Sequence, residues 1–218
     1  MSKNVLLKAL ILFFVCMNVT YAQSLGVIYP FDDAEKDIDF GNFVSKLKFA
    51  LVNKDVSFVQ DIIDDDIQFP FGIESGKSMF LQEWQLENSK SELWSLLLSL
   101  INLGFVKNNE QGIIGFNFPY YWGHSVFNNP VIECNGIVVI KPDVNVYERP
   151  DYNSKIIATS NFDVFLEKER NDNFTRIQFT RTKIGFIQND ALRNICDYRG
   201  GFVKKSGKWK LVWFIAGD

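Results

Sequence analysis

Short apolar segments separated by polar turns fill residues 144–192. Five such segments follow one another, and the Asn-Asp-Asn triplet at 171–173 has the turn chemistry expected between two of them. Gly185 stands inside one segment, where a glycine indicates a β-bulge or a close backbone approach. The pattern predicts a small five-stranded β-barrel within residues 131–196.

Residues before this barrel follow a helical period instead. Apolar side chains recur every three or four positions on one face of a first helix, which is made of Phe40, Phe43, Val44, Leu47, Ala50 and Leu51. Shorter helices are expected at 56–63 and 76–84, and a fourth at 93–103 ends before Gly104. Residues 67–72 alternate as a strand. We therefore expect a helix-rich N-terminal domain with a small sheet over residues 23–130.

The last residues predict a β-hairpin. Two apolar-rich segments flank Ser206 and Gly207, a pair that suits a two-residue turn. An isolated hairpin is marginally stable at best in water, so this one needs a sheet to join. We expect residues 197–218 to return to the N-terminal domain, which makes the barrel an insertion in an α+β chain.

The first 22 residues have the pattern of a secretory signal peptide. Lys3 and Lys8 flank an apolar run over 9–17, and small residues precede a cleavage site after Ala22. A single membrane anchor is the alternative, but the run is well short of the roughly 20 residues that a span needs. A lipidated Cys16 is a further alternative, which Val15 disfavours because a small residue is expected before such a cysteine. The protein is thus predicted to be exported, periplasmic or extracellular, with no membrane span once the signal is removed.

Two cysteines then remain, Cys134 and Cys196, one on each side of the predicted barrel. The first and last strands of a small barrel often end near one another, which would bring the two residues within disulfide range. An oxidising compartment permits the bond, and closing a loop of about 60 residues contributes roughly 4 kcal/mol in the chain-entropy model. The alternative is two unrelated buried thiols.

Composition excludes some functions. Apolar residues make up 47% of the chain and aromatic residues 15%, enough for packed cores. The formal net charge of −3 gives no basic face for nucleic acid, so nucleic acid is not an expected partner.

The barrel segment also resembles the bacterial SH3-type domains of cell-envelope proteins. Members of that family open with an Asn-Val-Arg element, a Pro and a Ser-Lys-Val-Ile-like strand; this chain has Asn-Val-Tyr at 145–147, Pro150 and Ser-Lys-Ile-Ile at 154–157. Gly-Phe-Ile at 185–187 stands where the family has Gly-Trp-Val. The resemblance implies a non-enzymatic domain that binds an envelope peptide, peptidoglycan or a protein.

Four aromatic residues of this segment are candidates for a shallow ligand groove. They are Tyr147, Tyr152, Phe174 and Phe186. Tyr147 replaces the usual Arg of the family, and Phe174 and Phe186 replace the usual tryptophans. The alternative is that Phe174 and Phe186 fill the barrel core.

The flanking region resembles nuclear-transport-factor-2-like α+β domains in its layout of helices followed by strands. This resemblance implies a second possible function, a small-molecule-binding or isomerase-like protein with a pocket in the N-terminal domain. Tyr120, Tyr121 and Asp66 would then mimic a tyrosine donor and an aspartate base.

Other candidate chemistry is sparse. His124 is the sole histidine, and Cys134 would be a nucleophile only if the fold placed His124 beside it. The aspartates at 61 and 64–66 lack the spacing and central glycine of a calcium loop, so a solvated helix end is the simpler interpretation. We therefore predict no catalytic residues, no metal site and no cofactor.

Overall fold

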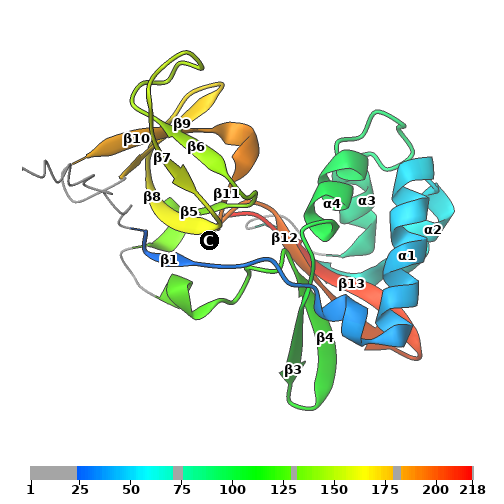
Figure 1. The fold of residues 1–218 in the computed structure, drawn as a ribbon. Helices are drawn as coiled ribbons and strands as arrows, with labels where there is room; N and C mark the ends of the chain where they lie inside the picture. The colour runs from blue at the N-terminus through cyan, green and yellow to red at the C-terminus, as the bar shows by residue number, and fades with distance from the viewer. Residues whose placement is uncertain (1–23, 71–75, 129–131, 179–182, 218) are drawn as a thin grey trace, which may run out of the picture.

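The computed structural model describes residues 24–70, 76–128, 132–178 and 183–217, and these residues form two β-sheets with helices packed on one of them (Figure 1). The first sheet has five strands in the order β2-β13-β12-β4-β3. Their bounds are β2 Ile63–Gln68, β3 Val106–Glu110, β4 Ile113–Phe118, β12 Arg199–Lys205 and β13 Lys208–Ile215. Only β2 and β13 pair in parallel. Two of the three inner strands are therefore the last two of the chain.

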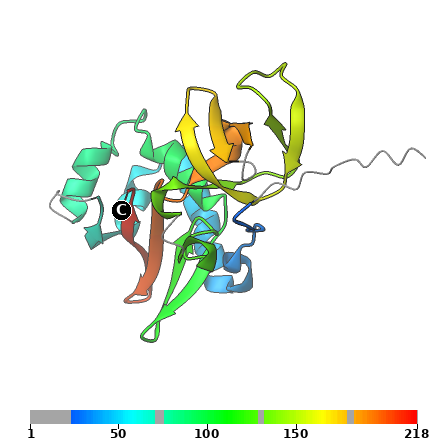
Figure 2. The ribbon, with the colours of Figure 1, turned by 90° about the vertical axis from the view of Figure 1, so that its left-hand side faces the viewer.

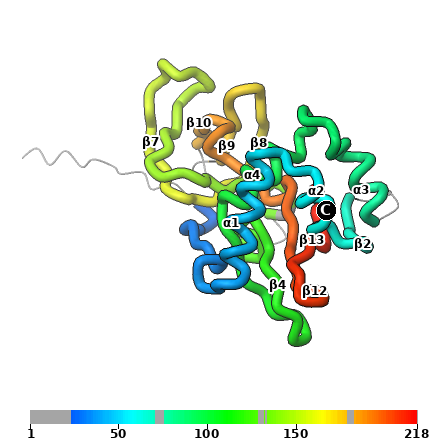
Figure 3. The backbone as a smooth tube through the Cα atoms, turned by 90° about the vertical axis from the view of Figure 1, so that its right-hand side faces the viewer, coloured from blue at the N-terminus to red at the C-terminus, as the bar shows by residue number. Residues whose placement is uncertain are grey.

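Four α-helices cover one face of the five-stranded sheet within the described residues: α1 Ile38–Asn53, α2 Val56–Ile62, α3 Lys77–Trp84 and α4 Leu93–Ile101. Figure 3 shows α1 and α4 side by side over the strands. Burial of the predicted apolar face of α1 is confirmed for Phe40, Val44, Leu47, Ala50 and Leu51, while Phe43 is half-buried against the same core. Aromatic rings join this face to the sheet; Phe40 stacks on Phe116 with ring centroids 3.8 Å apart.

The turn of the C-terminal hairpin is the predicted one. Lys205 pairs with Lys208 across Ser206 and Gly207, which have φ of 48° and 81°. Positive φ at both turn residues matches the right-handed twist of the flanking strands. β12 pairs with β4 and β13 pairs with β2, so the hairpin fills the centre of the sheet. The β3–β4 hairpin projects from the sheet beside it, in green in Figure 2.

The second sheet has eight strands. Seven run in the order β11-β5-β8-β9-β10-β6-β7, and β1 pairs with β8 beside this path. Their bounds are β1 Gly26–Val27, β5 Gly136–Val139, β6 Val144–Tyr147, β7 Ile156–Ser160, β8 Asp163–Arg170, β9 Phe174–Gln178, β10 Ile184–Gln188 and β11 Leu192–Asn194. Short 3-10 helices connect the strands or precede them, namely η1 Asp33–Lys36, η2 Ser125–Asn128, η3 Glu133–Asn135 and η4 Asn189–Ala191.

The predicted fold class is wrong in two respects. The described residues hold thirteen strands, most of them antiparallel, so the chain has no helix-rich N-terminal domain with a small sheet. The predicted five-stranded SH3-like barrel does not close either, although β6 to β10 confirm five strands between residues 144 and 192. The physical reason is that β8 pairs with β5 and β1 along its first half, and with β9 after a register shift at Glu167 and Glu169. Because β8 pairs with β1 and β5 as well as β9, the strands form an open sheet instead of a closed barrel.

An apolar cluster joins the two sheets. It contains Ile28, Tyr120, Tyr121, Ile132, Val138, Val164 and Ile195. The segment that includes β1 crosses it: Ile28 N donates to Phe162 O of the eight-stranded sheet, and Asp33 N donates to Phe105 O beside the other sheet. Across the described part of the chain, none of the helices is both long enough and apolar enough to span a membrane.

Candidate functional site

The four aromatic residues singled out in the sequence lie together on the eight-stranded sheet, on β6, β9, β10 and the loop after β6. Figure 1 shows these three strands in the upper part of that sheet. The ring centroid of Phe174 is 5.7 Å from that of Tyr147 and 4.9 Å from that of Tyr152. Phe186 is the direct cross-strand partner of Tyr147. The local sequence pattern did not require these four residues to meet, because they come from three different strands and one loop.

Strand register explains how the residues meet. Phe186 of β10 faces Tyr147 on one side and Arg176 of β9 on the other, and Arg176 in turn pairs with Glu169 of β8. Residues directly opposite one another in neighbouring strands point to the same face of a sheet. Four adjacent strands therefore place two aromatic and two charged side chains in one row on the same face, in which Tyr147 is buried, with 7% of its surface exposed.

This row borders a hollow of about 370 Å³ on the face of the sheet. We call it the aromatic groove, and its lining residues are Pro150, Glu169, Asn171, Phe174, Arg176, Ile184 and Phe186. The ion pair between Arg176 and Glu169, 3.6 Å long, gives the groove one charged side. The groove thus combines rings, a proline and one pair of opposite charges.

The core of the sheet lies on its other face. Ile177 and Ile187 belong to that core, and each alternates with a groove residue along its strand. Successive side chains in a strand point to opposite faces. Phe174 and Phe186 consequently point away from the cluster that contains Ile177 and Ile187, although Phe174 is itself buried, as its alternative expected. Phe174 is 3% exposed because it packs under Tyr147 and Tyr152, and Tyr152 is 58% exposed.

Hydrogen bonds in the 171–173 turn fix the position of Phe174. The Asn171 side chain accepts from the backbone N–H of Asn173 at 3.0 Å and of Phe174 at 2.8 Å. Asn189 then donates to the Asn171 carbonyl at 2.7 Å and accepts from the Thr175 hydroxyl at 2.7 Å. The turn was predictable from its composition. Asn189 was not, because nothing nearby in the sequence marks it as a partner of residues 14 to 18 positions earlier.

Hydrogen bonds between its own residues stabilise the loop that carries Tyr152. Ser154 is buried, its hydroxyl accepts from Arg149 N at 3.0 Å, and its own N–H donates to Asp151 O. Glu148 N donates to Lys155 O and closes the base of the loop. Tyr152 therefore stands on an ordered loop at the edge of the groove.

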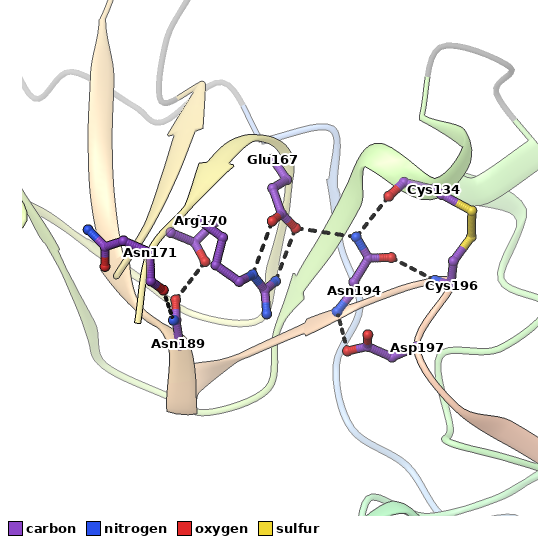
Figure 4. A network of polar contacts seen from close by, with 9 residues as sticks. Cys134, Glu167, Arg170, Asn171, Asn189, Asn194, Cys196 and Asp197 are labelled. Carbon is purple, nitrogen blue, oxygen red and sulfur yellow. Dashed lines mark hydrogen bonds and ion pairs between the residues drawn. A yellow bond between two sulfur atoms is a disulfide. The ribbon is translucent and has the colours of Figure 1, made fainter. Parts of the chain in front are cut away.

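Figure 4 shows the disulfide and the polar network next to it. Cys134 and Cys196 are bonded, with Cα atoms 5.2 Å apart, as predicted. The Asn194 amide donates to Cys134 O at 2.8 Å and to Glu167 at 3.3 Å, and its oxygen accepts from Cys196 N at 2.8 Å. Glu167 also holds Arg170 through two hydrogen bonds of 3.0 Å. The network joins the disulfide to β8, whose far end borders the groove.

The other residues considered as catalytic or metal-binding candidates have structural roles or ion-pair partners instead. Cys134 is bonded to Cys196, so it has no thiol that could act as a nucleophile. Asp64 pairs with Lys205 at 2.8 Å and Asp61 with Lys208 at 3.5 Å. Over the described ranges, no three His, Cys, Asp or Glu side chains gather in a way that could hold a metal ion.

The proposed tyrosine and aspartate partners are separated. Tyr120 and Tyr121 lie in the cluster between the sheets, while Asp66 lines a different hollow on the five-stranded sheet. Burial raises the pKa of Tyr120 to about 12 and also raises the pKa of Tyr121. The Tyr120 hydroxyl donates to Ile28 O at 3.2 Å, so it is used in joining the sheets.

A second hollow, missed by the sequence reasoning, lies near the disulfide where the two sheets meet. It measures about 560 Å³ and is lined by Trp122, Gly123, His124, Phe127, Asn128, Ile195, Cys196 and Arg199. The Arg199 guanidinium stacks on Trp122 at 4.4 Å and donates to the carbonyls of Cys196 and Gly217 at 3.2 and 2.6 Å. Its lining residues come from segments about seventy positions apart, which left no local signal. We call it the junction hollow.

Comparison with known proteins identifies no relative: no family model, no curated protein and no solved structure matches this chain.

Proposed function

We propose that this protein is an exported, non-enzymatic binding protein of the cell envelope, and that the aromatic groove binds an extended peptide. The peptide would be a peptidoglycan stem or a segment of a partner protein. The observation that carries the proposal is the row of Tyr147, Phe186, Arg176 and Glu169 across four strands, with Tyr152 and Pro150 at its edge.

The chemistry of the groove suits such a ligand. Shallow grooves lined by aromatic rings bind extended, proline-rich peptides, whose backbone is already ordered before binding. Tyr and Phe offer large contact areas while losing little side-chain entropy. The Arg176–Glu169 pair supplies opposite charges that a peptide's own charged groups can match.

Export is supported by two independent features. The N-terminal apolar run resembles a signal peptide, although it lies outside the described residues. Disulfides form and persist in oxidising compartments, and this chain holds one.

Retention on purified peptidoglycan, and titration with proline-containing peptides, test the proposal. The Tyr152→Ala and Phe186→Ala variants should each weaken binding about tenfold, since truncating an aromatic anchor typically costs more than 1 kcal/mol. Tyr29→Ala is the matched control, because Tyr29 is 68% exposed and is not one of the residues that line the groove. Equal binding by all three variants would place the peptide elsewhere. Failure of the wild-type protein to bind either ligand class contradicts the proposal.

The junction hollow favours a second candidate function, the binding of a small molecule. Its volume of about 560 Å³ falls within the range of roughly 300–1,000 Å³ typical of ligand pockets. Trp122 and Phe127 supply apolar walls, and His124 supplies a polar group whose Nδ1 already accepts from Val126 N at 3.2 Å. A metabolite panel should then contain a compound that raises the melting temperature of the wild-type protein but not of Phe127→Ala. A flat response across the panel counts against this function.

A further inference from the structure

Another hollow lies beside the helices. It measures about 400 Å³ and is lined by the loop that joins α3 to α4, by the first turn of α4 and by Tyr198 just before β12 (Figure 1). It shares no lining residue with the aromatic groove or the junction hollow. We call this hollow, formed by residues 83–92 with Leu96 and Tyr198, the helix-loop hollow.

Two aromatic rings form the apolar wall of the helix-loop hollow. Trp84 and Tyr198 meet edge to face, with ring centroids 5.2 Å apart and ring planes at 66°. Tyr198 also stacks on Phe214 of β13 at 5.1 Å, and Trp84 lies 5.6 Å from the same ring. Both residues are half-buried, so core contacts hold the rings in place while part of each remains open to the hollow. A ring that is already fixed loses little freedom when a ligand binds it.

Polar side chains make up the rest of the lining that a ligand could use. Glu83 and Glu92 can only accept hydrogen bonds, whereas Lys90 can only donate them. The amide of Gln85 can do both. Within the described residues, no hydrogen bond or ion pair engages these four side chains or the Tyr198 hydroxyl. A ligand can therefore pair with them by displacing water alone.

The loop that carries these groups is ordered by its own hydrogen bonds. Trp94 Nε1 donates to Asn88 O at 3.2 Å, and the Asn88 side chain accepts from Lys90 N at 2.9 Å. The Ser91 hydroxyl donates to Trp84 O. The helix-loop hollow is therefore preformed, as sites for small ligands usually are.

Charges around the hollow balance one another. Residues 76–92 hold three glutamates and two lysines. The ammonium group of Lys54 donates to Ser89 O and brings the count to three of each sign. Asp197 and Arg199, on either side of Tyr198, add one more of each. These residues offer an ionic ligand no net attraction, so the lining favours a neutral one.

We propose that the helix-loop hollow binds a neutral saccharide unit. The C–H face of a pyranose ring would lie against Trp84 and Tyr198, since aromatic rings with a polar tip suit a ligand that is apolar on one face and polar at its edge. Each sugar hydroxyl both donates and accepts, so one sugar can pair with the carboxylates, the ammonium group and the amide together. A purely apolar ligand would leave these polar groups without partners, which opposes its binding.

Calorimetric titration with soluble saccharides tests the proposal. The probes are glucose, galactose, N-acetylglucosamine, maltose, cellobiose and chitobiose, each at millimolar concentration. At least one should bind saturably, and added salt should change its affinity little because the ligand carries no charge. Tetramethylammonium and glucose 6-phosphate, the cationic and anionic probes, should not bind.

Variants locate the site. The double variant Glu83→Ala, Glu92→Ala should weaken binding of that saccharide at least tenfold, since hydrogen bonds to ionised groups are the strong ones. Tyr198→Ala should weaken it about tenfold, the usual effect of truncating an aromatic anchor. Glu87→Ala is the matched control and should bind as the wild type does, because Glu87 is an exposed glutamate of the same loop that does not line the hollow. Circular dichroism checks that all variants fold.

Three outcomes overturn the proposal. The wild-type protein could bind none of the saccharides saturably. The Glu83→Ala, Glu92→Ala variant could bind the saccharide as tightly as the wild type does. Tetramethylammonium could bind in place of every saccharide and lose affinity in this variant, which would assign the hollow to an organic cation. The Tyr152→Ala variant of the aromatic groove should bind the saccharide normally, which separates this site from the one proposed for the peptide.

Discussion

Gly200 lies where β12 passes over the ring of Phe118, and the position leaves no room for a side chain. A Cβ there would overlap the tip of the Phe118 ring and lie 3.0 Å from Trp213 O. Phe118 is completely buried, so its ring cannot move aside into solvent. A residue without a side chain is what allows the inner strands of this sheet to pack at this point.

Gly200→Ala should therefore destabilise the protein by about 1–3 kcal/mol, the usual cost of overpacking a core. Urea unfolding measures the loss. In the double variant with Phe118→Leu, the smaller side chain should relieve the overlap, so that the two costs are less than additive. Strict additivity would show that the Phe118 ring is not the obstacle.

The disulfide is the element that ties the two ends of the 134–196 segment together. It closes across 62 residues of sequence, and Asn194 links both cysteines to β8. A cross-link of this span acts mainly on the unfolded chain, by limiting how far the loop can open. The eight-stranded sheet owes part of its stability to this bond rather than to its apolar core alone.

Replacing both cysteines, Cys134→Ser with Cys196→Ser, should lower stability by about 4 kcal/mol in the chain-entropy model. Thermal unfolding with and without dithiothreitol measures this. Reductant should lower the melting temperature of the wild type toward that of the variant and leave the variant unchanged. A wild type indifferent to reductant, once its thiols are shown to be free, contradicts the expectation.

How far the elements could be predicted depends on whether their signal is local. The buried face of α1 and the turn at Ser206 and Gly207 were predictable, because periodicity and turn chemistry act over a few residues. β3 was not, since its sequence Val-Lys-Asn-Asn-Glu has no apolar alternation and forms a strand only by pairing with β4. The open sheet was not either, because the pairing of β8 with β1 and β5 joins residues far apart in sequence.

The candidate site divides in the same way. Aromatic residues in a short-stranded segment suggested a groove, and the structure brings Tyr147, Tyr152, Phe174 and Phe186 together. The charged side of the groove could not be predicted from the sequence, because Arg176 and Glu169 meet only through the register of β8 and β9. The sequence therefore predicted part of the set of residues that line the groove. It could not predict which face of the sheet they occupy, because long-range strand pairing determines that face.

At the scale of the whole molecule, the two sheets are joined by a small cluster in which Tyr120 and Tyr121 are both buried. Their hydroxyls are neutral at ordinary pH, and burial raises their pKa above the usual value of about 10. Above about pH 10, the folded protein therefore keeps protons on these two hydroxyls that the unfolded chain would release. Arg193 of β11, which donates to Ser99 of α4 at 3.3 Å, links the eight-stranded sheet to a helix that covers the other sheet.

Alkaline pH should loosen this junction. Because the folded pKa of Tyr120 is raised to about 12, its contribution to stability is complete below about pH 10 and declines as the pH rises toward 12. Urea midpoints measured from near pH 8 to about pH 11 should fall less steeply in Tyr120→Phe than in the wild type. Tyr152→Phe, which alters an exposed tyrosine, should leave the slope unchanged. Equal slopes in all three proteins contradict the expectation.

The central place of β12 and β13 also governs the order in which the protein can be made. The edge strand β2 and the β3–β4 hairpin are synthesised early, but β2 pairs with β13 and β4 with β12, so they cannot join one sheet until residues 199–215 have left the ribosome. Completing the sheet waits for contacts of very long sequence separation, which slow folding. The five-stranded sheet of a chain built this way stays incomplete until both β12 and β13 have been synthesised.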